Sequence, residues 1–153
     1  MVRLADTDDA LRGALEGLEC RSYDTKPWVK GPPLNERRVA VISTAGLLKR
    51  GDHPFSMGAK DYRVIPGDTD SGDVVMSHVS TNFDRTGFQQ DINVAFPIDR
   101  LRELADEGVI GSVAEYHYSF MGATDPDDMA PKAQELAGLL KKDNVDAVLL
   151  APV

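Results

Sequence analysis

The sequence has a single cysteine, only short apolar runs and fewer positive than negative charges. With Cys20 alone, the chain can form neither an intrachain disulfide nor a cysteine-based metal cage. The longest apolar runs, such as residues 147–153, are far shorter than the roughly 20 residues that a membrane-spanning helix needs. The acidic N-terminus does not fit the pattern of a signal peptide. These absences predict a cytoplasmic protein without a membrane segment.

Acidic residues outnumber basic ones, 25 to 17, giving a formal net charge of −8. Such a charge repels nucleic acid, and the basic residues form no cluster longer than the pairs Arg37–Arg38 and Lys141–Lys142. We therefore expect no nucleic-acid partner. The hydrophobic fraction of 42% and the length of 153 residues are typical of one globular domain.

Residue periodicity divides the chain into an N-terminal part, residues 1–37, and an α/β part, residues 38–153. The first part is predicted to form a helix over 4–18 and an extended, proline-rich arm around Trp28. In the second part strands alternate with helices, which predicts a layered α/β fold with a mainly parallel sheet and flanking helices. The predicted strands are 38–42, 62–65, 73–78, 114–120 and 145–150, the predicted helices are 97–107 and 131–142, and 81–93 is predicted to be a loop.

Parallel sheets bind ligands beyond the carboxyl ends of their strands. Side chains at predicted strand ends are therefore the candidate pocket residues, namely Ser43, Thr44, His78, Asp84 and Met121. For Ser43 and Thr44 we favour capping of a turn over a pocket role. For His78 the alternative is a histidine that is hydrogen-bonded to loop backbone. The acidic residues near His78 match no known metal motif in their spacing, so no metal site is predicted.

Seven segments, read in order, carry a family resemblance. They are VAVISTAGL (39–47), YRVIP (62–66), Ser77-His78 with FDR (83–85), DIN (91–93), FPIDRLRELADEG (96–108), SFMG (119–122) and VDAVLL (145–150). The ordered set resembles the selenoprotein B family of glycine, sarcosine, betaine and D-proline reductases, over most of the chain from Val39 onward.

The resemblance implies a subunit of a system that reductively cleaves a C–N bond of glycine, betaine, sarcosine, D-proline or a related amine. It also implies a partner subunit whose pyruvoyl group binds the amine, and a selenocysteine whose selenolate displaces nitrogen. That residue is expected a few positions after the strand that matches 145–150, and the sequence ends at Val153. No catalytic residue is therefore assigned, and we expect this chain to be inactive alone and to lack the last helix and strand.

One hypothesis for this end is a UGA selenocysteine codon that has been read as a stop. A UGA followed by an open frame would support the hypothesis, and a UAA or UAG codon would contradict it. The alternative function is a non-catalytic small-molecule-binding or assembly protein. A third, weaker alternative is a metal-dependent hydrolase that uses Asp68, Asp73, His78 and Asp84. An uncovered last strand would also favour a homo-oligomer.

Overall fold

The computed structural model describes residues 3–17, 22–80 and 85–153. Contacts divide the chain into two units, Met1–Lys30 and Gly31–Val153. The first unit contains a 3-10 helix, η1 (Leu4–Asp6), and helix α1 (Asp9–Glu16) in place of the single helix predicted over 4–18. The reason for the break is Asp8, whose extended backbone and side-chain acceptor for the Leu11 N–H start a new helix. No helix in the described part is long and apolar enough to cross a membrane.

The second unit confirms the predicted layered α/β fold. Its strands are β1 (Arg38–Ser43), β2 (Leu47–Lys49), β3 (Arg63–Pro66), β4 (Val74–Met76), β5 (Ser112–Val113), β6 (Tyr116–Ser119) and β7 (Ala147–Ala151). Its helices are α2 (Thr86–Gln90), α3 (Ile98–Asp106) and α4 (Pro126–Lys142), with 3-10 turns η2 (Leu34–Glu36), η3 (Ser71–Asp73) and η4 (Ile92–Val94).

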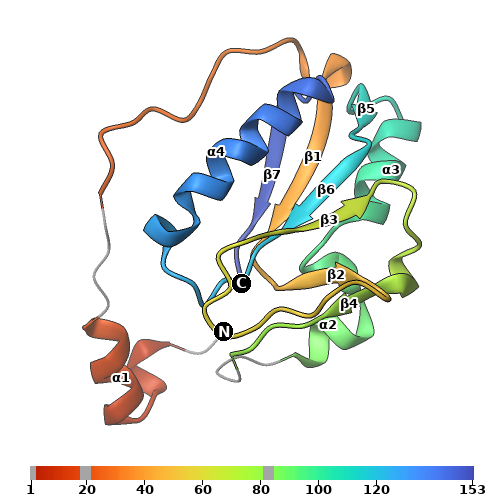
Figure 1. Cartoon of the computed structure of the whole chain (residues 1–153). Helices are drawn as coiled ribbons and strands as arrows, with labels where there is room; N and C mark the ends of the chain where they lie inside the picture. Colours follow the sequence, from red (N-terminus) through yellow and green to blue (C-terminus); the bar gives the residue numbers. More distant parts are fainter. Residues whose placement is uncertain (1–2, 18–21, 81–84) are drawn as a thin grey trace. The chain divides into compact units, whose positions relative to one another are not determined.

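Strand β1 is the centre of the main sheet (Figure 1). It pairs in parallel with β7 on one side and with β5 and then β6 on the other. Strand β3 pairs with β6 in antiparallel orientation and forms the far edge. The sheet is therefore mainly parallel, as predicted.

Alternate residues of β1 face the two helical layers. Val39 and Val41 join a core cluster with Ile98 and Leu101 of α3. Ile42 packs against the second cluster, which includes Leu136 of α4. Because β1 is apolar on both faces, it can be covered by a helix on each side, which gives the three layers visible in Figure 1.

The strand predicted over 73–78 does form, as β4, but it is not part of the main sheet. It pairs in antiparallel orientation with β2, which the sequence analysis did not predict. Gly46, with a φ of +64°, turns the chain out of the main sheet directly after β1 and so creates this separate pair.

Two further predictions of local structure were wrong. The expected loop over 81–93 contains α2 and η4 in its described portion. Helix α4 begins at Pro126 instead of Pro131, because the Asp125 side chain accepts the Asp127 N–H and caps an earlier start.

The strand pairing beside β1 is interrupted between β5 and β6. Val39 pairs with Val113 and Ile42 with Tyr118, so two residues of β1 face four residues, 114–117, of the neighbouring segment. The imidazole of His117 fills the gap, since its Nδ1 accepts the Val41 N–H at 2.9 Å. A bulge of this kind normally leaves backbone groups unpaired, and here a side chain takes the place of the missing carbonyl.

Asp143, directly after α4, stabilises the same interruption between β5 and β6 through contacts at the surface of the sheet. Its carboxylate accepts the Glu115 N–H at 2.7 Å and pairs with the guanidinium of Arg38. The neighbouring Asp146 accepts the Arg38 N–H at 3.0 Å. These contacts join the start of β1, the bulge and the start of β7 at the amino end of the sheet. Burial is the largest single effect on Asp143 and raises its pKa, but the hydrogen bonds from Arg38 and the Glu115 N–H together with the charge of Arg38 outweigh it, so the pKa is lowered overall.

His117 is fully buried and neutral in this arrangement. Since Nδ1 accepts a hydrogen bond, the ring proton is on Nε2. Burial, with a smaller contribution from the positive charge of Arg102, lowers the pKa of His117 to about 4.

Acidification is therefore expected to destabilise the fold through His117. Its pKa is about 4 when folded and about 6.5 when unfolded, so its stabilisation is present above pH 6.5 and is lost as the pH falls toward 4. The loss amounts to as much as about 3 kcal/mol in the free energy of unfolding. Urea unfolding at a series of pH values measures it. His117→Gln, whose side-chain oxygen can accept the Val41 N–H without titrating, should depend less on pH, and equal slopes would contradict the assignment.

Candidate functional site

Three chain segments meet at the carboxyl edge of the main sheet, where they follow β1, β6 and β7. They are bonded to one another through the backbone. The Phe120 N–H donates to the Ser43 carbonyl at 2.9 Å, and the Gly122 N–H donates to the Thr44 carbonyl at 2.8 Å. On the other side, the Thr44 N–H donates to the Ala151 carbonyl at 3.1 Å. The edge is therefore built from three mutually fixed loops.

The hydroxyl groups predicted at this edge have local partners. Ser43 is fully buried, and its hydroxyl accepts the Ala45 N–H at 3.1 Å, as the turn-capping alternative expects. Thr44 Oγ1 accepts the Val153 N–H at 2.8 Å and lies 3.2 Å from the Val153 carbonyl oxygen. Thr44 thus ties the segment after β7 to the segment after β1.

Gly46 brings His78 and Met121 to the same edge. A Cβ built at position 46 would lie 2.9 Å from the His78 Cα and 3.0 Å from the Met121 Cε, so only glycine allows this approach. Met121 is fully buried, whereas His78 keeps 6% of its surface exposed. Four of the five predicted pocket residues, Ser43, Thr44, His78 and Met121, thus lie on segments that meet at this edge. The fifth, Asp84, lies outside the described residues.

The imidazole of His78 is held by its own loop. Its Nδ1 accepts the Ser80 N–H at 3.1 Å, and Arg85 donates to the His78 carbonyl at 2.9 Å. Burial lowers the pKa of His78, opposed by the hydrogen bond from Ser80 and assisted by the charge of Arg85. The lowered pKa favours a neutral imidazole at pH 7, with its proton on Nε2 because Nδ1 accepts the Ser80 N–H.

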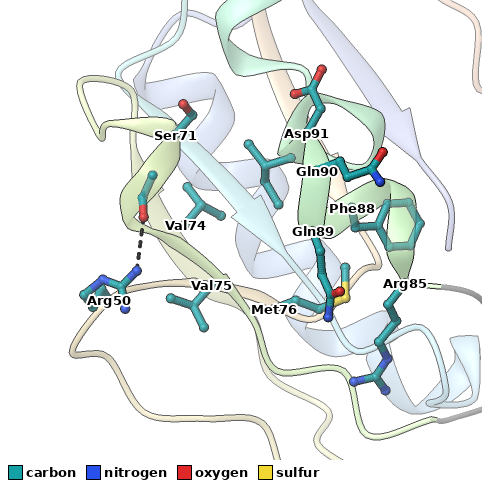
Figure 2. Close-up of a pocket in the computed structure, with 12 residues that line it drawn as sticks. Arg50, Ser71, Val74, Val75, Met76, Arg85, Phe88, Gln89, Gln90 and Asp91 are labelled. Carbon is teal, nitrogen blue, oxygen red and sulfur yellow. Dashed lines mark hydrogen bonds between the residues drawn. The ribbon is translucent and has the colours of Figure 1, made fainter.

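A cavity of about 510 Å³ lies beside this edge, between β4 on one side and α2 with η4 on the other (Figure 2). Figure 2 shows Arg50 and Arg85 at its opposite ends, with the Gln89 side chain extending between them toward Met76. Its volume is in the range of small-molecule sites. Its lining combines apolar residues with two arginines, two glutamines, Ser71 and the carboxylate of Asp91, so it offers positive charge at Arg50 and Arg85 and negative charge at Asp91.

The two arginines of this cavity also have structural contacts. Arg50 donates to the Gly72 carbonyl at 3.1 Å and is 3.4 Å from the Asp73 carboxylate. Arg85 links the cavity to the carboxyl edge through its bonds to the backbone of His78 and Ser80. The sequence analysis missed this cavity because its walls are the five-residue α2 and the separate strand pair, neither of which was predicted.

Of the predicted pocket residues that the structure describes, namely Ser43, Thr44, His78 and Met121, none lines the cavity. Within the described ranges, no three His, Cys, Asp or Glu side chains are grouped so that they could hold a metal ion. Of the residues proposed for a hydrolase site, Asp73 is paired with Arg50 and Asp84 is not described. Cys20 also lies outside the described residues.

Comparison with known proteins gives consistent matches. Residues 23–153 match the family described as glycine/sarcosine/betaine reductase selenoprotein B. The D-proline reductase subunit gamma of Acetoanaerobium sticklandii is 38% identical over 144 residues, which are 89% of this chain and 59% of the relative. The glycine reductase complex component B subunit gamma of Symbiobacterium thermophilum is 34% identical, over 84% of this chain and 32% of the relative.

A third relative is the betaine reductase complex component B subunit beta of Peptoclostridium acidaminophilum, at 32% identity over 76% of this chain and 28% of the relative. The chain thus spans 59% or less of the length of these three curated relatives. No solved structure matches it.

Substitution of Gly122 tests how tightly the carboxyl edge is built. A Cβ at this position would lie 2.3 Å from the Val153 carbonyl oxygen and 2.8 Å from that of Thr44. Gly122→Ala is therefore expected to displace the segment after β7 and to lower the free energy of unfolding by about 1–3 kcal/mol. Chemical denaturation measures the change.

Gly138→Ala is the matched control, because nothing lies within 4 Å of the added Cβ in α4. It is expected to stabilise the chain by about 0.5–1 kcal/mol. Equal effects of the two substitutions would show that the edge is not tightly packed at Gly122.

Proposed function

Because this chain belongs to the glycine/sarcosine/betaine reductase selenoprotein B family, we propose that it forms part of a reductase subunit that cleaves a C–N bond of a small amine. The match confirms the resemblance carried by the seven ordered segments. It covers 131 of the 153 residues, from 23 to 153, including the whole of both sheets. That match is the single observation that carries the proposal.

D-proline is the substrate that the comparisons favour. The relative named D-proline reductase subunit gamma is 38% identical to this chain and is matched over 59% of its own length. For the glycine reductase component B subunit gamma, the identity is 34% and the matched share of its length is 32%. Reductive cleavage of the Cα–N bond of proline takes up two electrons and two protons. It opens the ring to 5-aminopentanoate.

Partner subunits are expected because the relatives are named as subunits or complex components. We propose that one partner carries the pyruvoyl group that the family implies. When bound to an amine, such a carbonyl group withdraws electrons from the C–N bond. The family's redox selenocysteine has no counterpart in this sequence, so no bond-breaking step is assigned to these residues. A cytoplasmic location remains a prediction.

The role proposed for this chain is to build and orient the edge at which the reaction takes place. Thr44 and Gly122 fix the segment that follows β7. Thr44 and His78 remain the pocket candidates, together with the undescribed Asp84, because Ser43 and Met121 are fully buried. The adjacent cavity offers Arg50 and Arg85 to a carboxylate, the group that glycine, sarcosine, betaine and proline share.

The alternative is a non-catalytic binding or assembly protein of the same fold. The same cavity favours it, since Arg50 and Arg85 can hold a small carboxylate there without any redox group. The two functions differ in whether this part of the fold supports turnover.

A chimera separates the two. In the D-proline reductase subunit gamma, the part that matches this chain is replaced by residues 23–153, and the complex is assembled with its partner subunits. We expect D-proline-dependent formation of 5-aminopentanoate. Adding Gly122→Ala is expected to lower the rate by roughly tenfold or more, because small displacements of reacting groups reduce rates strongly.

Gly138→Ala in the same chimera should leave the rate unchanged. A folded and fully assembled chimera without turnover would contradict the reductase proposal. Retained binding of D-proline by that inactive chimera would support the alternative.

A further inference from the structure

A second cavity, of about 390 Å³, lies toward the amino end of the main sheet, between β3 and β6 on one side and the end of α4 on the other. Its apolar walls are Val64 and Leu139, together with the rings of Tyr116 and Tyr118. A cavity of this size with a mainly apolar lining and a few polar groups is typical of small-molecule sites. It shares no residue with the cavity of Figure 2.

The cavity exists because α4 is tied to the segment of β3 at one end only. The Lys60 ammonium pairs with the Asp128 carboxylate at 2.7 Å, and the Tyr62 hydroxyl bonds to Glu135 at 3.0 Å. Within the described ranges, no hydrogen bond or ion pair joins β3 to α4 beyond Glu135. The helix and the edge strand therefore enclose a space between Val64 and the last turn of α4.

One wall of this space carries a buried hydroxyl group. Tyr118 is 2% exposed and lines the cavity, and its ring packs edge-on against Tyr62, with 5.6 Å between the ring centroids. In the part of the chain that the structure describes, its hydroxyl has no hydrogen-bond partner. Burial raises the pKa of Tyr118, with further contributions from Tyr62 and from the negative charge of Asp143. The hydroxyl is therefore protonated at neutral pH and can donate to a ligand.

The charged groups around the cavity balance one another. Asp143 pairs with the Arg38 guanidinium and accepts the Glu115 N–H at 2.7 Å, so its carboxylate is already bonded. The other two charges of the lining, the Lys142 ammonium and the Glu115 carboxylate, have opposite signs. An apolar cavity without net charge favours a neutral ligand, since an ion would lose its hydration without gaining a counter-charge.

We propose that this cavity binds a neutral molecule with one aromatic ring, whose oxygen or nitrogen atom accepts the hydrogen bond of the Tyr118 hydroxyl. The ring packs between Val64 and Leu139, where the two tyrosine rings offer the offset and edge-to-face contacts that aromatic groups prefer. This site does not depend on the reductase proposal, because it rests only on the residues around the second cavity.

Acetophenone is the probe that tests the proposal, because it is neutral and combines one ring with a carbonyl oxygen that accepts a hydrogen bond. It is titrated into the full chain, and the amide signals are followed by NMR. We expect shifts at residues 64, 116, 118 and 139–143, with a dissociation constant of about 1 mM or less. Ethylbenzene, which has the same ring and no oxygen, is expected to bind more weakly.

Tyr118→Phe separates the hydrogen bond from the packing of the ring. It keeps the aromatic wall and removes the hydroxyl, so it is expected to weaken acetophenone binding about fivefold and to leave ethylbenzene binding unchanged. An equal loss for the two probes would overturn the proposed hydrogen bond.

Val64→Phe fills the cavity with a ring of its own and is expected to weaken both probes by about tenfold or more. Val109→Phe is the matched control, because the two valines are 39% and 42% exposed and Val109 does not line the cavity. It should leave binding unchanged, and circular dichroism checks that each variant folds. Undiminished binding by Val64→Phe, or amide shifts confined to other parts of the chain, would overturn the proposal.

Discussion

The hydrogen bond from the Val41 N–H to the His117 ring is the contact on which the main sheet depends. Strand β1 is the centre of this sheet and must be paired on both sides, yet the segment beside it carries two extra residues. A buried N–H without a partner is unfavourable by about 1–3 kcal/mol. The imidazole supplies that partner from within the bulge, so β1 stays continuous up to Ser43.

Continuity of β1 determines what can be built at its carboxyl end. Because β6 resumes its pairing at Tyr118, the loops after β1 and β6 leave the sheet side by side. Close backbone approaches at Gly46 and Gly122 then bring in the His78 loop and the segment after β7. The amino end of the sheet, where Asp143 bonds to Arg38 and Glu115, therefore contributes to stability. The carboxyl end of the sheet carries the residues of the proposed function.

The elements that the sequence predicts well are those with a strong local pattern. Strand β1 and strand β7 are β-branched or aliphatic runs, and α3 combines a proline start with helical spacing of its apolar residues. The elements that it predicts poorly are short or depend on distant contacts. Strand β2 has three residues, and the place of β4 outside the main sheet follows from the turn at Gly46.

The candidate site likewise has features that the sequence predicts and features that depend on distant contacts. The strand-end rule predicted Ser43, Thr44 and Met121 at one edge, because the carboxyl ends of parallel strands share that edge. His78 reaches it for another reason, since β4 lies outside the main sheet and Gly46 allows the close approach of the His78 backbone. The rule gave no sign that Ser43 and Met121 would be fully buried, nor that His117 would repair the sheet. Those outcomes depend on strand register, which no single segment of the sequence encodes.

Site-specific photo-crosslinking to the partner subunits of D-proline reductase tests most directly whether the carboxyl edge faces the reaction. The crosslinker is placed either at the exposed Pro152, at this edge, or at Val109, which precedes β5 at the amino end. The proposed function predicts crosslinks to a partner subunit from position 152 and none from position 109. Crosslinks from position 109 alone would contradict it.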